Sequence, residues 1–260
     1  MDKSRNGSEL EEKFIKALRY QLAGLKTKVL NDFSEKNYEK ELNSLIGDSL
    51  YSKFYFATPE YVLIRFMGRV SISIGRRLGE IYDKIPRIVT SLRYSIAPNK
   101  IAPKLNGLEL DIGIKLSDLK KEDVKFVKKV IENHVGISAN KGIGIEIRYN
   151  FNPNDSSRLR KDCTMAENIK NIGFTPIYLV FSSISPRDEA IARLKRAGWH
   201  FFIGEHAAQF SEELLGLNLA VVLDKKTIKE EIQKEVTEIM KSMINSYAFQ
   251  TVLSKYKEKI

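Results

Sequence analysis

The sequence has a single cysteine, three histidines and no apolar run long enough to cross a membrane. One cysteine, Cys163, excludes an internal disulfide and fits a protein of the reducing cytoplasm. The histidines do not stand with Cys163 at a spacing typical of a zinc site. The first twelve residues contain no apolar segment of the kind that a secretory signal has. We therefore expect a soluble cytoplasmic protein.

Acidic residues are fewer than basic ones, and the net charge is +10. Such an excess favours a polyanionic partner, most often nucleic acid. It is concentrated between residues 65 and 104, where nine basic residues, six of them arginine, stand against two acidic ones. Arginine binds phosphate oxygens and base edges with a forked geometry. We predict DNA contacts from Arg65, Arg69, Arg76 and Arg77, while a solvated helix face is the alternative interpretation for any one of them.

Helical periodicity predominates at both ends of the chain, in residues 1–104 and 220–260. Apolar side chains recur there at three- and four-residue steps. Pro86 interrupts the segment 59–92, so we predict two helices with a break at that point. The tail from Lys225 has one apolar stripe, which would pack on its own core or on a second subunit.

Strands and helices alternate in the middle of the chain, residues 105–219. Leu108–Leu116 and Ile143–Phe151 alternate apolar and polar residues with a period of two, as expected of strands with one buried face. Further strands are predicted at 175–181 and 199–203, with helices between the strands. The pattern predicts an α/β fold with a mixed central sheet flanked by helices and with helical N- and C-terminal extensions.

Two carboxylates stand on the polar faces of the first two predicted strands. They belong to Asp111 and Glu146, and Arg148 follows two residues later on the same face as Glu146. Hydrolysis of a phosphodiester requires a metal ion, an activated water and a balancing positive charge. Carboxylates on neighbouring strands are suitable ligands for Mg²⁺. The pattern predicts such a site, and solvent-exposed charges on edge strands are the alternative.

The longest motif runs from Ile143 to Phe210. A Gly-Ile-Glu-Ile-basic-aromatic strand leads into a polar loop and a helix, then into Gly173-Phe-Thr-Pro and Gly198-Trp. This order resembles the PD-(D/E)xK nuclease family, which includes most type II restriction endonucleases, and is similar to its ApaLI-like group. The resemblance covers about a quarter of the chain clearly and Leu105–Leu219 loosely.

The resemblance implies a restriction-endonuclease-like core, Mg²⁺ as cofactor, and a homodimer that cuts both strands of a short site in double-stranded DNA. It implies that Asp111 and Glu146 are metal ligands, with Glu80 as a further acidic residue from the preceding helix. Glu109 stays open as an alternative to Asp111. Arg148 stands where the family usually has lysine, so it would stabilise transition-state charge rather than deprotonate water. The helix predicted between the two acidic strands is a second departure from the family pattern.

Further DNA contacts are predicted in and after the polar loop. Asn152 and Asn154 suit adenine edges and Arg158 suits guanine, while turn formation explains the loop composition equally well. Arg158, Arg160 and Lys161 are candidates for phosphate contacts.

These observations favour a type II restriction endonuclease. The alternatives are a structure-specific nuclease of repair or recombination and a non-catalytic basic DNA-binding protein.

Overall fold

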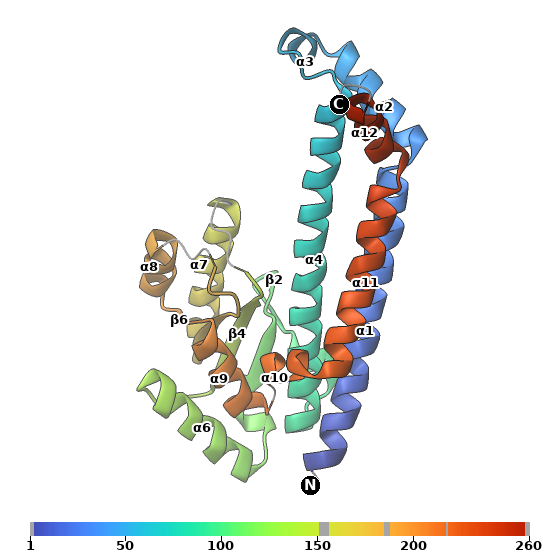
Figure 1. Ribbon diagram of the computed structural model, residues 1–260. Helices are drawn as coiled ribbons and strands as arrows, with labels where there is room; N and C mark the ends of the chain where they lie inside the picture. The colour runs from blue at the N-terminus through green and yellow to red at the C-terminus, as the bar shows by residue number, and fades with distance from the viewer. Residues whose placement is uncertain (1–2, 151–155, 185–187, 217, 258–260) are drawn as a thin grey trace. The chain divides into compact units, whose positions relative to one another are not determined.

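The computed structural model describes residues 3–150, 156–184, 188–216 and 218–257. The chain divides into two compact units. We call Met1–Leu10 together with Gly79–Leu223 the α/β unit, and Glu11–Leu78 together with Asp224–Ile260 the helical unit. Figure 1 shows the ribbon and labels many of their elements.

The helical unit combines helices from both ends of the chain. They are most of α1 (Lys3–Asp32), α2 (Glu35–Gly47), α3 (Ser49–Lys53), the first part of α4 (Pro59–Tyr94), α11 (Lys226–Ile244) and α12 (Tyr247–Lys257). Ion pairs from Arg19 to Glu231 and from Lys26 to Glu238 join α1 to α11.

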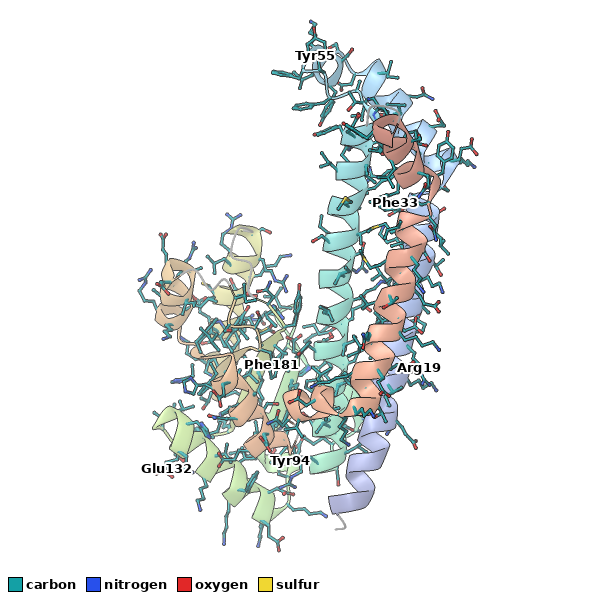
Figure 2. All side chains as sticks on the ribbon, in the orientation of Figure 1. Arg19, Phe33, Tyr55, Tyr94, Glu132 and Phe181 are labelled. Atoms are coloured by element: carbon teal, nitrogen blue, oxygen red, sulfur yellow. The ribbon has the colours of Figure 1, made fainter. Side chains whose placement is uncertain are left out.

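Buried apolar side chains from several helices form a cluster in this unit. Its buried members are Leu25, Val29, Phe33, Tyr38, Leu45, Val62, Phe66, Val70, Ile239, Met243 and Ala248. Phe33, labelled in Figure 2, is fully buried, and its ring centroid lies 5.3 Å from that of Phe66. Because Ile239 and Met243 belong to the same cluster, part of the apolar stripe of the tail packs on the core of its own chain.

The predicted break at Pro86 is wrong, because α4 continues through it from Pro59 to Tyr94. Proline in a helix interior removes a hydrogen bond and costs about 3 kcal/mol. Ile81, Ile85 and Val89 are buried on one side of this stretch, and the hydroxyl of Thr90 donates to the Pro86 carbonyl oxygen at 2.7 Å. Burial of these three apolar side chains offsets the free-energy cost of the proline.

The α/β unit contains the strands. After α4 come α5 (Pro98–Ile101), β1 (Lys104–Leu105), β2 (Leu108–Glu109), β3 (Ile112–Lys115), a 3-10 turn (Leu116–Asp118), α6 (Lys121–Val135), β4 (Gly142–Arg148), α7 (Ser156–Asn171), β5 (Phe174–Val180), α8 (Asp188–Ala197), β6 (His200–Ile203), α9 (Glu205–Leu215) and α10 (Leu219–Asp224). The main sheet has the order β3-β4-β5-β6. β3 is antiparallel to β4, whereas β4, β5 and β6 are parallel. The predicted α/β fold with a mixed sheet flanked by helices is therefore confirmed.

Helices cover both faces of the main sheet. On one face, Tyr178 and Val180 of β5 share a buried cluster with residues of α7 and α8. On the other face, the ring of Phe202 in β6 stacks on Phe210 of α9, with centroids 4.7 Å apart. A strand between two helical layers has no solvent-exposed face in its middle.

The prediction of one continuous strand over Leu108–Leu116 is wrong. Its first part forms a separate hairpin, in which β1 pairs with β2 around Asn106 and Gly107. Both turn residues have positive φ, 49° and 83°, as the Asn-Gly hairpin turn requires. Only β3 enters the main sheet, and Asp111 lies at the junction between the hairpin and the sheet.

None of the helices within the described part of the chain combines the length and the apolar character needed to cross a membrane.

We predict that Phe33→Ala destabilises the protein by about 3–5 kcal/mol, because it empties a fully buried site in the helical unit. Denaturant unfolding followed by circular dichroism measures this change. Tyr20→Ala on α1, the helix that ends just before Phe33, is the control, since Tyr20 is 73% exposed and its loss should change stability by less than about 0.5 kcal/mol. Equal effects of the two substitutions would contradict the assignment of this core.

Candidate active site

The antiparallel pairing of β3 and β4 brings Asp111 opposite Glu146. The register pairs Ile112 with Ile145, so Asp111 and Glu146 are the next facing positions. Asp111 Oδ2 accepts a hydrogen bond from the backbone N–H of Ile147 at 2.8 Å. The two strands are neighbours although α6 separates them in the sequence. The two carboxylates predicted to converge therefore lie side by side.

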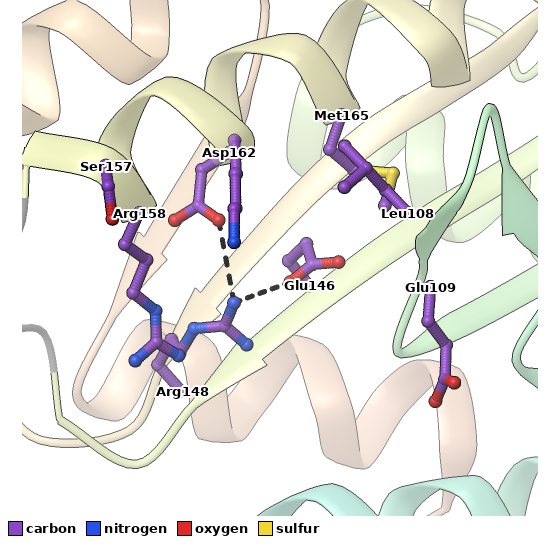
Figure 3. Close-up of a pocket in the computed structure, with 9 residues that line it drawn as sticks. Leu108, Glu109, Glu146, Arg148, Ser157, Arg158, Asp162 and Met165 are labelled. Atoms are coloured by element: carbon purple, nitrogen blue, oxygen red, sulfur yellow. Dashed lines mark hydrogen bonds and ion pairs between the residues drawn. The ribbon is translucent and has the colours of Figure 1, made fainter.

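Arg148 binds both carboxylates through its forked guanidinium. Nη1 donates to Asp111 Oδ2 at 3.0 Å and to the backbone oxygen of Ile147 at 2.7 Å. Nη2 donates to Glu146 Oε2 at 2.8 Å and lies 3.6 Å from Asp162 Oδ1. Figure 3 shows the contacts with Glu146 and Asp162. One cation thus gathers three carboxylates and a carbonyl.

Glu146 is buried, and the expectation that it stands on an open strand face is wrong. Only 3% of the surface of Glu146 is exposed. The preceding outward position is Gly144, where a Cβ atom would lie 3.0 Å from the side chain of Ile169 in α7. The absence of a side chain at Gly144 lets α7 lie close to β4, and α7 covers the face to which Glu146 belongs.

Asp162 on α7 is a member of the site that the sequence analysis missed. Its side chain is 9% exposed, and Oδ2 accepts a hydrogen bond from the hydroxyl of Tyr178 at 2.8 Å. The indole N–H of Trp199 donates to the Asp162 backbone oxygen at 2.8 Å, and the Trp199 ring meets that of Tyr178 edge to face. The available signal was helical spacing: Asp162 shares its face with buried Met165, Ala166 and Ile169.

A second cation, Arg87 of α4, binds the other side of Asp111. Its Nη2 lies 3.2 Å from Asp111 Oδ1 and 2.7 Å from Asp83 Oδ1, and its Nη1 donates to Glu109 Oε1 at 2.8 Å. Asp83 and Arg87 were also missed, although a separation of four residues on a helix is a signal for an ion pair. The carboxylate of Glu80, the predicted acidic residue of this helix, lies 3.6 Å from Lys84.

These contacts form one carboxylate–arginine network. Its members are Asp83, Arg87, Glu109, Asp111, Glu146, Arg148 and Asp162. Five carboxylates stand against two guanidinium groups, so negative charge is in excess.

Burial and the neighbouring negative charge raise the pKa values of two acids of the network, Glu146 and Asp83. Burial raises the pKa of Glu146 well above its usual range, Asp111 raises it further, and Arg148 opposes the shift. Burial and the neighbouring Asp111 raise the pKa of Asp83 to about 6, against the effect of Arg87. Burial lowers the pKa of Arg148, but Tyr178 and the surrounding carboxylates outweigh it, so the net shift is upward and this side chain stays charged.

A pocket of about 330 Å³ opens beside the network. It is lined by Leu108, Glu109, Glu146, Arg148, Ser157, Arg158, Lys161, Asp162 and Met165 (Figure 3). Two predicted phosphate contacts, Arg158 and Lys161, are therefore on its wall, and both are exposed. Arg160 is an exposed residue of the same helix. Asn152 and Asn154 lie outside the described residues.

The arginines predicted to contact DNA from α4 belong to the helical unit. Glu41 pairs with Arg65 at 2.8 Å and with Arg69 at 2.7 Å. Arg77 donates to Gln21 Oε1 at 3.1 Å, and Arg76 is exposed. Intramolecular pairing neutralises part of the positive charge that the sequence places on this helix.

The oxygen atoms that accept hydrogen bonds from Arg148 are also suitable ligands for a hard cation. Within the described residues no group of three or more His, Cys, Asp and Glu side chains is placed to hold a metal ion. Arg148 nevertheless binds two carboxylate oxygens and a backbone carbonyl oxygen, and oxygen is the ligand atom that Mg²⁺ prefers. The chemistry of Asp111, Glu146 and the Ile147 carbonyl therefore fits a magnesium ion.

No protein-family model matches the chain, and no curated protein or solved structure matches it either.

We predict that Glu146→Gln raises the melting temperature at pH 8. The pKa of Glu146 is raised by folding, so its ionisation lowers stability as the pH rises above the unfolded value of about 4.3. Glutamine keeps the shape without the buried charge, and each kcal/mol gained corresponds to roughly 2–4 °C. The advantage should shrink towards pH 5. Thermal melts at both pH values measure it.

Glu132→Gln is the control for this prediction, because Glu132 is exposed on α6. A Glu146→Gln variant less stable than the parent at pH 8 would contradict the prediction, because it would show that the ion pair with Arg148 stabilises the fold by more than the burial of the charge costs.

Proposed function

We propose that this protein is a Mg²⁺-dependent type II restriction endonuclease that hydrolyses both strands of a specific double-stranded DNA site. The observation that carries the proposal is the convergence of Asp111 and Glu146, from two adjacent strands, on the guanidinium of Arg148. Such a concentration of carboxylates lowers stability, and its presence beside a pocket is typical of a functional site.

The topology around these residues agrees with the resemblance. The Asp111 segment leads into β3, which is antiparallel to the Glu146 strand β4; α7 follows, and β5 returns parallel to β4. This supports a restriction-endonuclease-like core as part of the proposal.

Each residue would have a defined task in phosphodiester hydrolysis. Asp111, Glu146 and the Ile147 carbonyl would hold Mg²⁺, which stabilises charge on the phosphate and lowers the pKa of a bound water. Arg148 would stabilise negative charge that develops on the phosphate, and its high pKa keeps it from accepting a proton. Asp162 and Tyr178 contact Arg148 on the side of β4 that α7 covers.

The pocket wall supplies groups for substrate binding. Lys161 and Arg158 stand on α7 at the edge of the pocket that Glu146 and Arg148 also line. Cationic side chains at such an edge bind phosphate oxygens and position the backbone of a nucleic acid. The overall charge of +10 favours the same partner.

We predict that the purified protein cuts mixed-sequence plasmid DNA into discrete bands in the presence of Mg²⁺, and that Glu146→Ala lowers the cleavage rate by about 10³-fold or more, since a metal ligand is lost. Glu132→Ala, which removes an exposed carboxylate on α6, is the matched control and should cut normally. Gel electrophoresis of timed digests gives both rates.

The alternatives give other patterns. Preference for branched or damaged DNA over any sequence would indicate a structure-specific repair nuclease. Salt-dependent DNA binding without cleavage, indifferent to Mg²⁺ and to Glu146→Ala, would indicate a non-catalytic binding protein and overturn the proposal.

We also propose that the protein acts as a homodimer, because two identical active sites related by a two-fold axis suit a palindromic site. Support comes from an exposed stripe on α4 in the helical unit. Ile64, Met67, Ile74 and Leu78 are exposed there and, with Ser71, follow the three- and four-residue spacing of helices that pair with one another.

If the stripe joins two copies, Met67→Glu should shift the protein from dimer to monomer in size-exclusion chromatography with light scattering, since a buried charge disfavours the interface. Ile72→Glu, at an exposed position next to the stripe, should leave the dimer intact. A parent protein that is monomeric at every concentration would contradict the homodimer.

A further inference from the structure

We propose that the guanidinium of Arg148 occupies the position of the divalent ion, so that the ion and this side chain exclude each other and Arg148 must swing away before the metal can bind. The inference rests on the proposed function, since it concerns the oxygens assigned there to Mg²⁺.

The contacts of Arg148 are those that a bound cation would make. Asp111 Oδ2, Glu146 Oε2 and the Ile147 carbonyl oxygen lie 3.0, 2.8 and 2.7 Å from its nitrogens. These atoms belong to two different strand segments, and within the network the Arg148 guanidinium alone touches all three. A positive group already bound by three converging oxygens blocks them for a second cation, because the two charges would repel each other at contact distance.

The charge of the network explains why the position needs a cation at all. Asp111 and Glu146 face each other across the β3–β4 ladder, and Asp162 approaches from α7. Three carboxylates in a largely buried place repel one another unless a positive charge separates them. Arg148 supplies that charge.

The same structure leaves Arg148 able to move. Its Nε has no hydrogen-bond partner among the described residues although it is buried, and an unsatisfied buried donor lowers the stability of this side-chain position. Its side chain is 18% exposed and forms part of the pocket lining. Rotation towards the pocket would carry the guanidinium from the carboxylates to the wall that Lys161 and Arg158 share. There it would face a phosphate group of the substrate, so metal entry would deliver Arg148 to its proposed role.

Mn²⁺ binding to the full chain, followed by the electron paramagnetic resonance signal of free Mn²⁺, tests the inference without any activity assay. In the parent protein the ion binds only the fraction of molecules in which Arg148 has moved away, which weakens the apparent affinity. Arg148→Met removes the competing cation and keeps most of the side-chain volume. We expect it to bind Mn²⁺ roughly tenfold tighter or more, and Glu146→Gln in the same background should abolish the gain.

Arg87→Met is the matched control. Like Arg148→Met, it removes one positive charge that contacts Asp111. Arg87, however, contacts Asp111 Oδ1, whereas Arg148 contacts Oδ2. General electrostatic attraction would tighten Mn²⁺ binding equally in both variants, whereas mutual exclusion predicts a clearly larger gain for Arg148→Met. Circular dichroism checks that the variants are folded. If Arg148→Met does not fold, Arg148→Lys, which keeps the charge but cannot span the three oxygens, should give a smaller gain in the same direction.

The outcomes separate this inference from the proposed function. Unchanged or weaker Mn²⁺ binding by the Arg148 variants, or an equal gain from Arg87→Met, overturns mutual exclusion even if the protein cuts DNA. A large gain specific to Arg148 supports it even if no DNA substrate is cut. The absence of Mn²⁺ binding in the parent and in every variant overturns both the inference and the metal site on which the proposed function depends.

Discussion

The ion pairs between two guanidinium groups and five carboxylates are the constraint on which the α/β unit depends. Arg148 holds Asp111 to Glu146 and approaches Asp162, and Arg87 holds Asp111 to Asp83 and Glu109. Because the members come from α4, the β2–β3 junction, β4 and α7, the network joins most of the layers of this unit. Burying charges costs more than their attraction returns unless the geometry is favourable, so an apolar core would have been the more stable solution at this place.

Two features of the backbone bring the elements around this network close together. Gly144 lets α7 approach β4, and the Asn-Gly turn at Asn106–Gly107 directs Asp111 to the end of the β3–β4 ladder. Neither feature contributes a charged side chain, yet each determines where a carboxylate of the network lies. Burial of carboxylates lowers stability, and the raised pKa values of Glu146 and Asp83 are the physical sign of that cost.

Local patterns in the sequence were sufficient for the parts of the fold that depend on local forces. Period-two alternation predicted β4, short apolar segments predicted β5 and β6, and helical periodicity predicted the long terminal helices. Together these patterns placed Asp111, Glu146 and Arg148 near one another. The errors arose where tertiary packing decides. Burial of Ile81, Ile85 and Val89 keeps α4 continuous through Pro86. Helix α7 covers the face of β4 that carries Glu146, so this polar face is buried. Asp162 was missed because a carboxylate on an apolar helix face has meaning only once its partners across the sheet are known.

The protein has a single tryptophan, and Trp199 is bonded to the backbone of Asp162 while its ring rests on Tyr178, over which Arg148 lies. Tryptophan fluorescence of this protein therefore comes from Trp199 alone. Trp199 contacts Tyr178, and Tyr178 in turn contacts the guanidinium of Arg148. Indole emission depends on nearby charge and polarity, so any displacement of Arg148 should alter the colour or intensity of that light. The fluorescence of Trp199 can thus be used to follow the position of the Arg148 side chain in real time, without attaching a label.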